Sequence, residues 1–165
     1  MKIKNIDFLL ALLIIIVAAS FSIIVYLHWV GIGFFIGQFR LSHWLTIIGS
    51  SYIAIATPIF IILMRIYPQK TMILFRFHIF GNLVLFAFIL IHFASQMGRP
   101  ATNFPELGTG LAMFIAMALQ VTSGFTQRFF PINRNPKALK FFHASLIIIF
   151  YAAIMFHVLH GLGIT

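Results

Sequence analysis

Five long apolar stretches run along the chain, separated by short segments that contain proline, glycine, asparagine or charged residues. Each stretch is close to or longer than the roughly 20 residues that a helix needs to cross a hydrocarbon core of about 30 Å. The pattern predicts helical spans at residues 8–30, 43–64, 72–97, 107–125 and 141–163. We therefore expect an all-α integral membrane protein, a bundle of about five transmembrane helices in a single domain over residues 1–165.

The segments between the predicted spans are short. A folded domain needs about 50 residues or more, so no soluble domain, and no flavin or nucleotide domain, is expected. Residues 31–38 are predicted to form a glycine-rich turn. The first stretch follows Lys2 and Lys4 as a signal peptide would, but its apolar run continues to Val30, so we expect a retained helix.

Lysine and arginine are distributed unevenly between the two sides that five spans define. With the N-terminus in the cytoplasm, nine basic residues fall on the inner side: Lys2, Lys4, Arg65, Lys70, Arg76, Arg128, Arg134, Lys137 and Lys140. Only Arg40 and Arg99 fall on the outer side. Because cytoplasmic loops carry the excess of Lys and Arg, we predict a multi-pass protein of the cell membrane with an outer C-terminus.

The composition narrows the function classes. Of the 165 residues, 62% are hydrophobic and 8% are charged, against about 25% charged in a typical soluble domain. The formal charge of +9 forms no basic run or face, so nucleic-acid binding is not expected. Cysteine is absent, which excludes iron–sulfur clusters held by thiolates, disulfides and covalently attached haem in this chain.

Four histidines form two pairs with one spacing. His78 and His92 lie in the third predicted span, and the interval between them equals that between His143 and His157 in the fifth. This interval is about four helical turns, so it returns a side chain to within about 40° of the same face, about 21 Å further along the axis. Both spans run in the same direction. We therefore expect one histidine of each pair near the inner side of the membrane and the other near the outer side.

Two imidazoles at one depth on different helices match a bis-histidine haem, whose axial ligands lie on opposite sides of a flat macrocycle. The spacing predicts two stacked b-type haems, the inner one held by His78 and His143 and the outer one by His92 and His157. Ionisable residues are costly inside a membrane, which favours this hypothesis over separate packing residues. Zinc is less favoured because no depth offers three or four clustered ligands, and the predicted spans hold no Asp or Glu for a proton path.

Other polar residues have both a functional and a structural interpretation. His160 follows His157 by one turn and is an alternative outer ligand, or it meets a haem propionate or the outer substrate. Arg76 and Lys140 precede the inner ligands and either pair with haem propionates or reach lipid phosphates. Gly81 either admits a macrocycle edge or lets two helices pack closely.

Two further histidines lie at the predicted outer ends of spans. His28 and His43 stand beside tryptophans, as interfacial anchors do. The alternative is an acceptor or quinone pocket near the outer haem, built with Arg40 and Arg99.

Four of the five spans resemble the ferric reductase-like transmembrane domain, which ferric reductases, NADPH oxidases and the haem subunit of periplasmic methionine sulfoxide reduction share. The similar segments are Gly49 through Arg65, Arg76-x-His78-x-x-Gly81 with His92, Thr122-Ser123-Gly124, and Lys140-Phe141-Phe142-His143 with His157. The chain departs from the family in showing five spans where six are common, and in lacking the fused flavin and nicotinamide domain. Cytochrome b of quinol-oxidising complexes places two histidine pairs at such intervals too.

The resemblance implies an oxidoreductase component that transfers electrons from a cytoplasmic donor to an outer acceptor. The donor would be a separate flavoprotein, docking on the basic loops around Lys137 and Lys140, or membrane quinol. One alternative is a quinone-linked haem b anchor subunit of a respiratory oxidoreductase. Another is a haem-free channel or assembly subunit.

Overall fold

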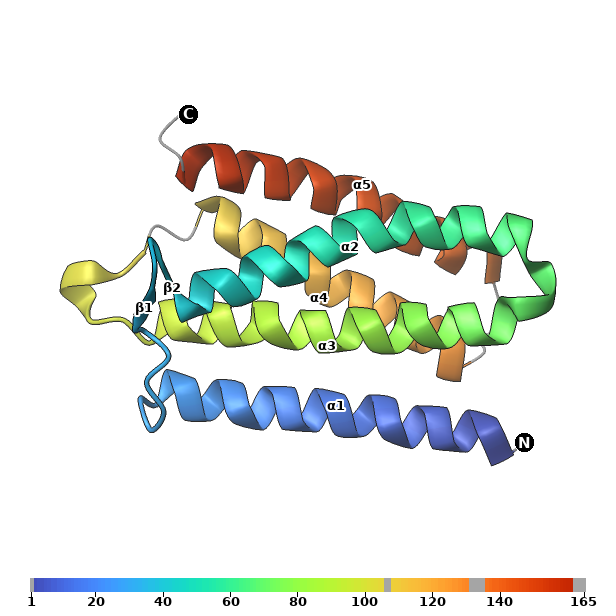
Figure 1. Cartoon of the computed structure of the whole chain (residues 1–165), viewed down its shortest axis with the longest axis horizontal. Coiled ribbons are helices and arrows are strands. Elements are labelled where there is room, and N and C mark those ends of the chain that lie inside the picture. Colours follow the sequence, from blue (N-terminus) through green and yellow to red (C-terminus); the bar gives the residue numbers. More distant parts are fainter. Residues whose placement is uncertain (1, 106–107, 131–135, 162–165) are drawn as a thin grey trace. The chain divides into compact units, whose positions relative to one another are not determined.

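A computed structural model describes residues 2–105, 108–130 and 136–161 of the chain (Figure 1). These ranges contain five long helices: α1 (Lys2–Tyr26), α2 (Leu41–Ile66), α3 (Thr71–Met97), α4 (Gly108–Phe129) and α5 (Pro136–Gly161). Two short 3₁₀ helices, η1 (Pro68–Lys70) and η2 (Ala101–Asn103), and two strands, β1 (Phe35–Ile36) and β2 (Phe39–Arg40), complete the described elements. All five long helices are long and apolar enough to cross a membrane, which confirms the predicted all-α membrane fold at this level.

The chain divides into two compact units, Met1–Pro105 and Glu106–Thr165. In the first unit, α3 packs against both α1 and α2. Figure 1 shows these three helices side by side, with α1 and α3 running in one direction and α2 in the other. In the second unit, α4 packs against α5.

Small residues bring α2 and α3 close together. The buried residues of α2 are mostly small or polar: Ser42, Gly49, Ser50, Ile53 and Thr57. A Cβ built on Gly49 would lie 3.1 Å from the carbonyl oxygen of Leu85, so a side chain there would push α3 away. Small residues at such a contact are typical of helix packing in membranes, where close backbone approach replaces the hydrophobic driving force.

An ion pair joins α1 to α3. The Arg76 guanidinium donates hydrogen bonds to both oxygens of Asp7, with Nη2 at 2.9 Å and Nε at 3.3 Å. The Asp7 side chain is 3% exposed and that of Arg76 is 45% exposed. Asp7 lies inside the apolar helical segment Asn5–Tyr26, so the prediction that the spans hold no acidic residue was wrong. The bidentate arginine explains how this carboxylate is tolerated there.

The predicted glycine-rich turn is a small β-hairpin between α1 and α2. Phe35 pairs with Arg40 and Ile36 with Phe39, and Gly37 at the turn has φ of 63°. A two-residue hairpin needs positive φ in its turn, which glycine adopts without strain. Trp44 donates a hydrogen bond from Nε1 to the Ile36 carbonyl at 2.9 Å and so ties the hairpin to α2.

The helices carry large apolar side chains on exposed faces. Leu9, Val17, Ile55, Phe77 and Ile148 are each more than half exposed, and many similar residues accompany them. In water this surface would favour aggregation, whereas in a bilayer it faces hydrocarbon. The exposed apolar faces therefore agree with helices in contact with lipid.

Candidate functional site

The four predicted haem ligands are divided between the two units. His78 and His92 lie on α3 of the first unit, and His143 and His157 lie on α5 of the second. Each predicted ligand pair takes one histidine from each unit, so the pairing stays a prediction. The surroundings of each ring within its own unit are defined.

His143 is held by a serine and a glycine of α4. The Ser123 hydroxyl lies 2.9 Å from Nδ1 of His143, and it also lies 2.9 Å from the carbonyl oxygen of Gln120. A hydroxyl has one proton, and the carbonyl oxygen only accepts, so Ser123 donates to Gln120 and accepts from His143 Nδ1–H. A Cβ built on Gly124 would lie 3.0 Å from His143 Cε1, which means that the ring occupies the space above this glycine.

His157, about 21 Å further along α5, has the same kind of surroundings. Its Nδ1 lies 3.2 Å from the hydroxyl of Thr109, and a Cβ built on Gly110 would lie 3.3 Å from its Cε1. The two histidines of α5 therefore have the same pattern of contacts: a hydroxyl residue of α4 lies at Nδ1, and the glycine that follows it leaves room for the ring.

These contacts depend on a repeated pair on α4, a hydroxyl residue followed by glycine, which was not predicted from the sequence. The interval from Thr109-Gly110 to Ser123-Gly124 equals the interval from His143 to His157. Since α4 and α5 run in opposite directions, the first hydroxyl–glycine pair of α4 meets the second histidine of α5, and the second pair meets the first. The sequence held a signal for this, a second occurrence of the histidine interval one helix upstream. Only the Thr122-Ser123-Gly124 segment had been singled out, as part of the family resemblance.

His92 is held by the backbone of α2. Its Nδ1 lies 3.0 Å from the carbonyl oxygen of Ser42, which can only accept, so His92 donates through Nδ1–H. The ring of His43 packs edge-on against the His92 ring, with centroids 5.2 Å apart and an angle of 64° between the planes. His43 is thus a neighbour of a predicted ligand, a position that its interfacial interpretation did not anticipate.

His78 is held from two sides. Its ring stacks on Phe60 of α2, with centroids 4.3 Å apart and 16° between the planes. Its Nδ1 lies 3.2 Å from the amide nitrogen of Asn82, one turn further along α3. An amide nitrogen only donates, so in this arrangement Asn82 donates to His78 Nδ1; a half-turn of the amide group would instead let Nδ1–H donate to the Asn82 oxygen, which is buried without a hydrogen-bond partner among the described residues.

The four rings therefore share one chemical feature, a protein partner at Nδ1. For His92 and His143 the partner is an acceptor, so in the neutral ring the proton is on Nδ1 and the lone pair is on Nε2. The contact of His157 with a hydroxyl is compatible with the same tautomer, and the contact of His78 with Asn82 becomes so when the amide group makes its half-turn. Histidines that ligate metals almost always donate their other ring N–H in this way, which fixes both the tautomer and the ring orientation. The donor set fits ligation of a haem iron, which these rings would bind through Nε2.

The predicted accessory residues have the following surroundings. Arg76 pairs with Asp7, a partner that neither sequence interpretation included. The Tyr52 hydroxyl occupies the place of a Cβ on Gly81, which provides a structural basis for the helix-packing interpretation of this glycine. Lys140 is exposed on the second turn of α5, and His160 is exposed near the end of that helix. The cofactor-binding roles of these residues stay predictions.

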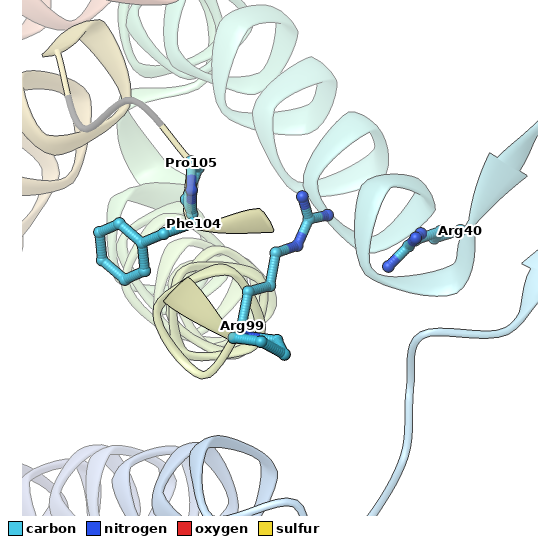
Figure 2. A pocket seen from close by; sticks show the side chains of 5 residues that line it. Arg40, Arg99, Phe104 and Pro105 are labelled. Carbon is cyan, nitrogen blue, oxygen red and sulfur yellow. The ribbon is translucent and has the colours of Figure 1, made fainter. Parts of the chain in front are cut away.

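Arg40 and Arg99 come together at the hairpin end of the first unit, where β1 and β2 lie. They line an open pocket of about 470 Å³ with Pro100, Phe104 and Pro105 (Figure 2). Of the two arginines and two histidines that the sequence suggested for a pocket, the arginines do line one. Its described lining does not include the histidines. His28, whose backbone φ is 62°, lies against Gly98, and His43 lies against His92.

Within the described ranges, no three or more His, Asp or Glu side chains gather in a group that could hold a bare metal ion. Comparisons of the chain with protein-family models, with curated proteins and with solved structures give no match.

Proposed function

We propose that this chain is a transmembrane electron-transfer protein that binds two b-type haems. The inner haem is held by His78 and His143 and the outer haem by His92 and His157. In the cell membrane, with the N-terminus in the cytoplasm, the chain passes electrons from a cytoplasmic donor to an acceptor on the outer side. This role is that of an oxidoreductase component similar to the ferric reductase-like transmembrane domain.

The observation that carries the proposal is the matched support of His143 and His157. A histidine that serves only packing needs its polar atoms satisfied, and any nearby partner suffices. Here two rings on one helix have the same partner type at the same nitrogen and a glycine beneath the same ring carbon. Such repetition is expected where both rings must present Nε2 in a fixed direction.

The residues of this chain have three tasks in the proposed function. The hydroxyls of Ser123 and Thr109 and the carbonyl of Ser42 keep Nδ1 protonated, so that Nε2 is basic and oriented. The apolar helices keep the site at low dielectric and away from water. The histidine spacing, about 21 Å along each helix, places one ligand towards each side of the membrane. The haem iron, when bound, supplies reversible one-electron chemistry.

The donor is proposed to be a separate flavoprotein. Lys137 and Lys140 are exposed on the first turns of α5, where a negatively charged partner surface would meet them. Membrane quinol is the other donor that the sequence left open, and quinone-site inhibitors distinguish the two.

Electron transfer across a sealed membrane tests the function directly. The chain is reconstituted in liposomes that contain ferricyanide, and a membrane-impermeant reductant is added outside. We expect internal ferricyanide to be reduced in wild type, and to be reduced only at the protein-free rate in a His92→Ala variant. A His160→Ala variant is the matched control and should keep the wild-type rate. Reduction at the protein-free rate in wild type that contains its full haem would contradict the proposal.

A further inference from the structure

Two arginines at the hairpin end of the first unit point their side chains at each other. Arg40 is on β2, directly before α2, and Arg99 follows the end of α3 by two residues. Figure 2 shows the two guanidinium groups approaching one another across the pocket, with Phe104 and Pro105 on its other side. Two like charges repel, so this arrangement is unfavourable unless an anion lies between them.

Both side chains are positioned by local structure. Arg40 pairs with Phe35 across the hairpin, and its Cζ lies 5.3 Å from the centre of the Phe35 ring, a cation–π contact. The backbone N–H of Arg99 donates to the Gln96 carbonyl at 3.2 Å, which continues the last turn of α3. The two arginines that line the pocket therefore come from two different elements, the hairpin and the end of α3.

The described residues supply no carboxylate to this pocket. Their one acidic side chain is Asp7, near the start of α1, where it is paired with Arg76. That position is at the opposite end of the unit from the hairpin, which follows the end of α1. Burial and the charge of Arg40 both lower the pKa of Arg99, burial more strongly, which agrees with an uncompensated pair of cations. The chain's second acid, Glu106, lies outside the described residues and is included in the test below.

We propose that this pocket binds a small oxyanion, a phosphate or carboxylate group, clamped between Arg40 and Arg99. Planar guanidinium groups form paired charge-assisted hydrogen bonds with such anions. Pro100, Phe104 and Pro105 line the pocket beside the two arginines and give it an apolar surface. The proposal does not depend on haem binding.

The position of the pocket favours two sources of the oxyanion. Arg40 directly precedes the membrane-spanning segment Leu41–Ile66, and Arg99 follows the segment Pro68–Met97 by two residues. Both arginines are thus at the boundary where lipid headgroups lie, so a headgroup phosphate is one source and a soluble oxyanion is the other. The two have the same recognition chemistry and differ in how they reach the site.

The test measures thermal stabilisation of the purified full chain in an uncharged maltoside detergent. One arm adds inorganic phosphate at constant ionic strength, with chloride as the balancing salt, and the other adds phosphatidylglycerol. We expect a saturable rise in the unfolding temperature in at least one arm. A response to both ligands identifies a general oxyanion site, and a response to the lipid alone identifies a headgroup site. Each result supports the proposal.

Variants locate the response. Arg40→Gln and Arg99→Gln should each weaken the apparent affinity roughly tenfold, since each removes a charge-assisted hydrogen bond. Arg65→Gln removes an exposed arginine at the other end of α2 and should leave the affinity unchanged.

Two results would overturn the proposal. The first is no saturable response of wild type in either arm, and the second is the same response in Arg40→Gln as in wild type. If wild type gives no response, two further measurements identify the reason. A response in Glu106→Gln would mean that Glu106 already neutralises the pair, and lower haem content in both arginine variants would assign the arginines to the cofactor instead.

Discussion

The glycines beneath His143 and His157 provide a graded test of ring position. A Cβ on Gly124 would lie 3.0 Å from Cε1 of His143, and a Cβ on Gly110 would lie 3.3 Å from Cε1 of His157. Carbon atoms in favourable contact are about 3.5 Å apart or more. Gly124→Ala therefore forces His143 to move by about 0.5 Å, and Gly110→Ala forces His157 to move by about 0.2 Å.

The two displacements have different consequences for the ring. A functional constellation tolerates about 0.5 Å of misplacement, and an N–H···O hydrogen bond spans only about 2.7–3.2 Å. The larger shift is thus enough to break the His143–Ser123 bond of 2.9 Å. Loss of such a supporting contact lowers metal affinity about 10- to 100-fold, or about 1.4–2.7 kcal/mol. We expect the Gly124→Ala loss to lie in this range and the Gly110→Ala loss to lie below it.

The assay measures the rate at which each variant loses haem to an excess of an apo-globin scavenger, together with a redox titration that resolves the two haems. Gly108→Ala is the matched control, because a Cβ at Gly108 meets nothing within 4 Å. Alanine has a higher helix propensity than glycine in a helix interior, so this gain is larger at Gly124 than at Gly108, the first residue of α4, and it opposes the expected loss of haem. If Gly124→Ala loses haem no faster than Gly108→Ala, the inference that His143 is a fixed ligand above Gly124 is refuted.

Three further predictions concern single side chains. Ser123→Ala should shift the midpoint potential and speed haem loss from the inner site about 10- to 100-fold, while Thr122→Ala, an exposed neighbour, should match wild type in the same assays. His157→Ala should lose one haem and His160→Ala none in a pyridine haemochrome count; the opposite result would make His160 the outer ligand. Arg76→Gln should destabilise the fold by about 1–3 kcal/mol and more than Asp7→Asn, because it leaves a buried carboxylate without its guanidinium, whereas Asp7→Asn leaves a half-exposed arginine that reaches water. Thermal unfolding in detergent measures the last difference, and equal effects would contradict it.

Much of the fold was predictable from hydropathy, because lipid exposure requires apolar side chains on each crossing helix. The start of α1 was the main exception. The prediction placed the first span at residue 8, whereas the helix begins at Lys2 and carries Asp7 in its apolar segment. The carboxylate within this segment is paired with Arg76, 69 residues away, and no local pattern reports such a partner.

The candidate site was predictable in part. The repeated histidine interval follows from helix geometry and is visible in the sequence. The matching interval between Thr109-Gly110 and Ser123-Gly124 was equally visible, but it becomes meaningful only when α4 is known to run antiparallel to α5. The acceptor of His92 could not have been found, since it is the backbone carbonyl of Ser42 and a carbonyl has no residue signature. A pocket that includes Arg40 and Arg99 was one of the two interpretations that their placement in the sequence left open, and its described lining lacks His28 and His43.

The haem content of the purified protein tests the central claim most directly, namely that four imidazoles with supported Nδ1 atoms bind iron through Nε2. A pyridine haemochrome count on wild type should give about two haems per chain, and His92→Ala should give about one, with the inner haem retained. Wild type without haem, or His92→Ala with an unchanged count, would contradict the account.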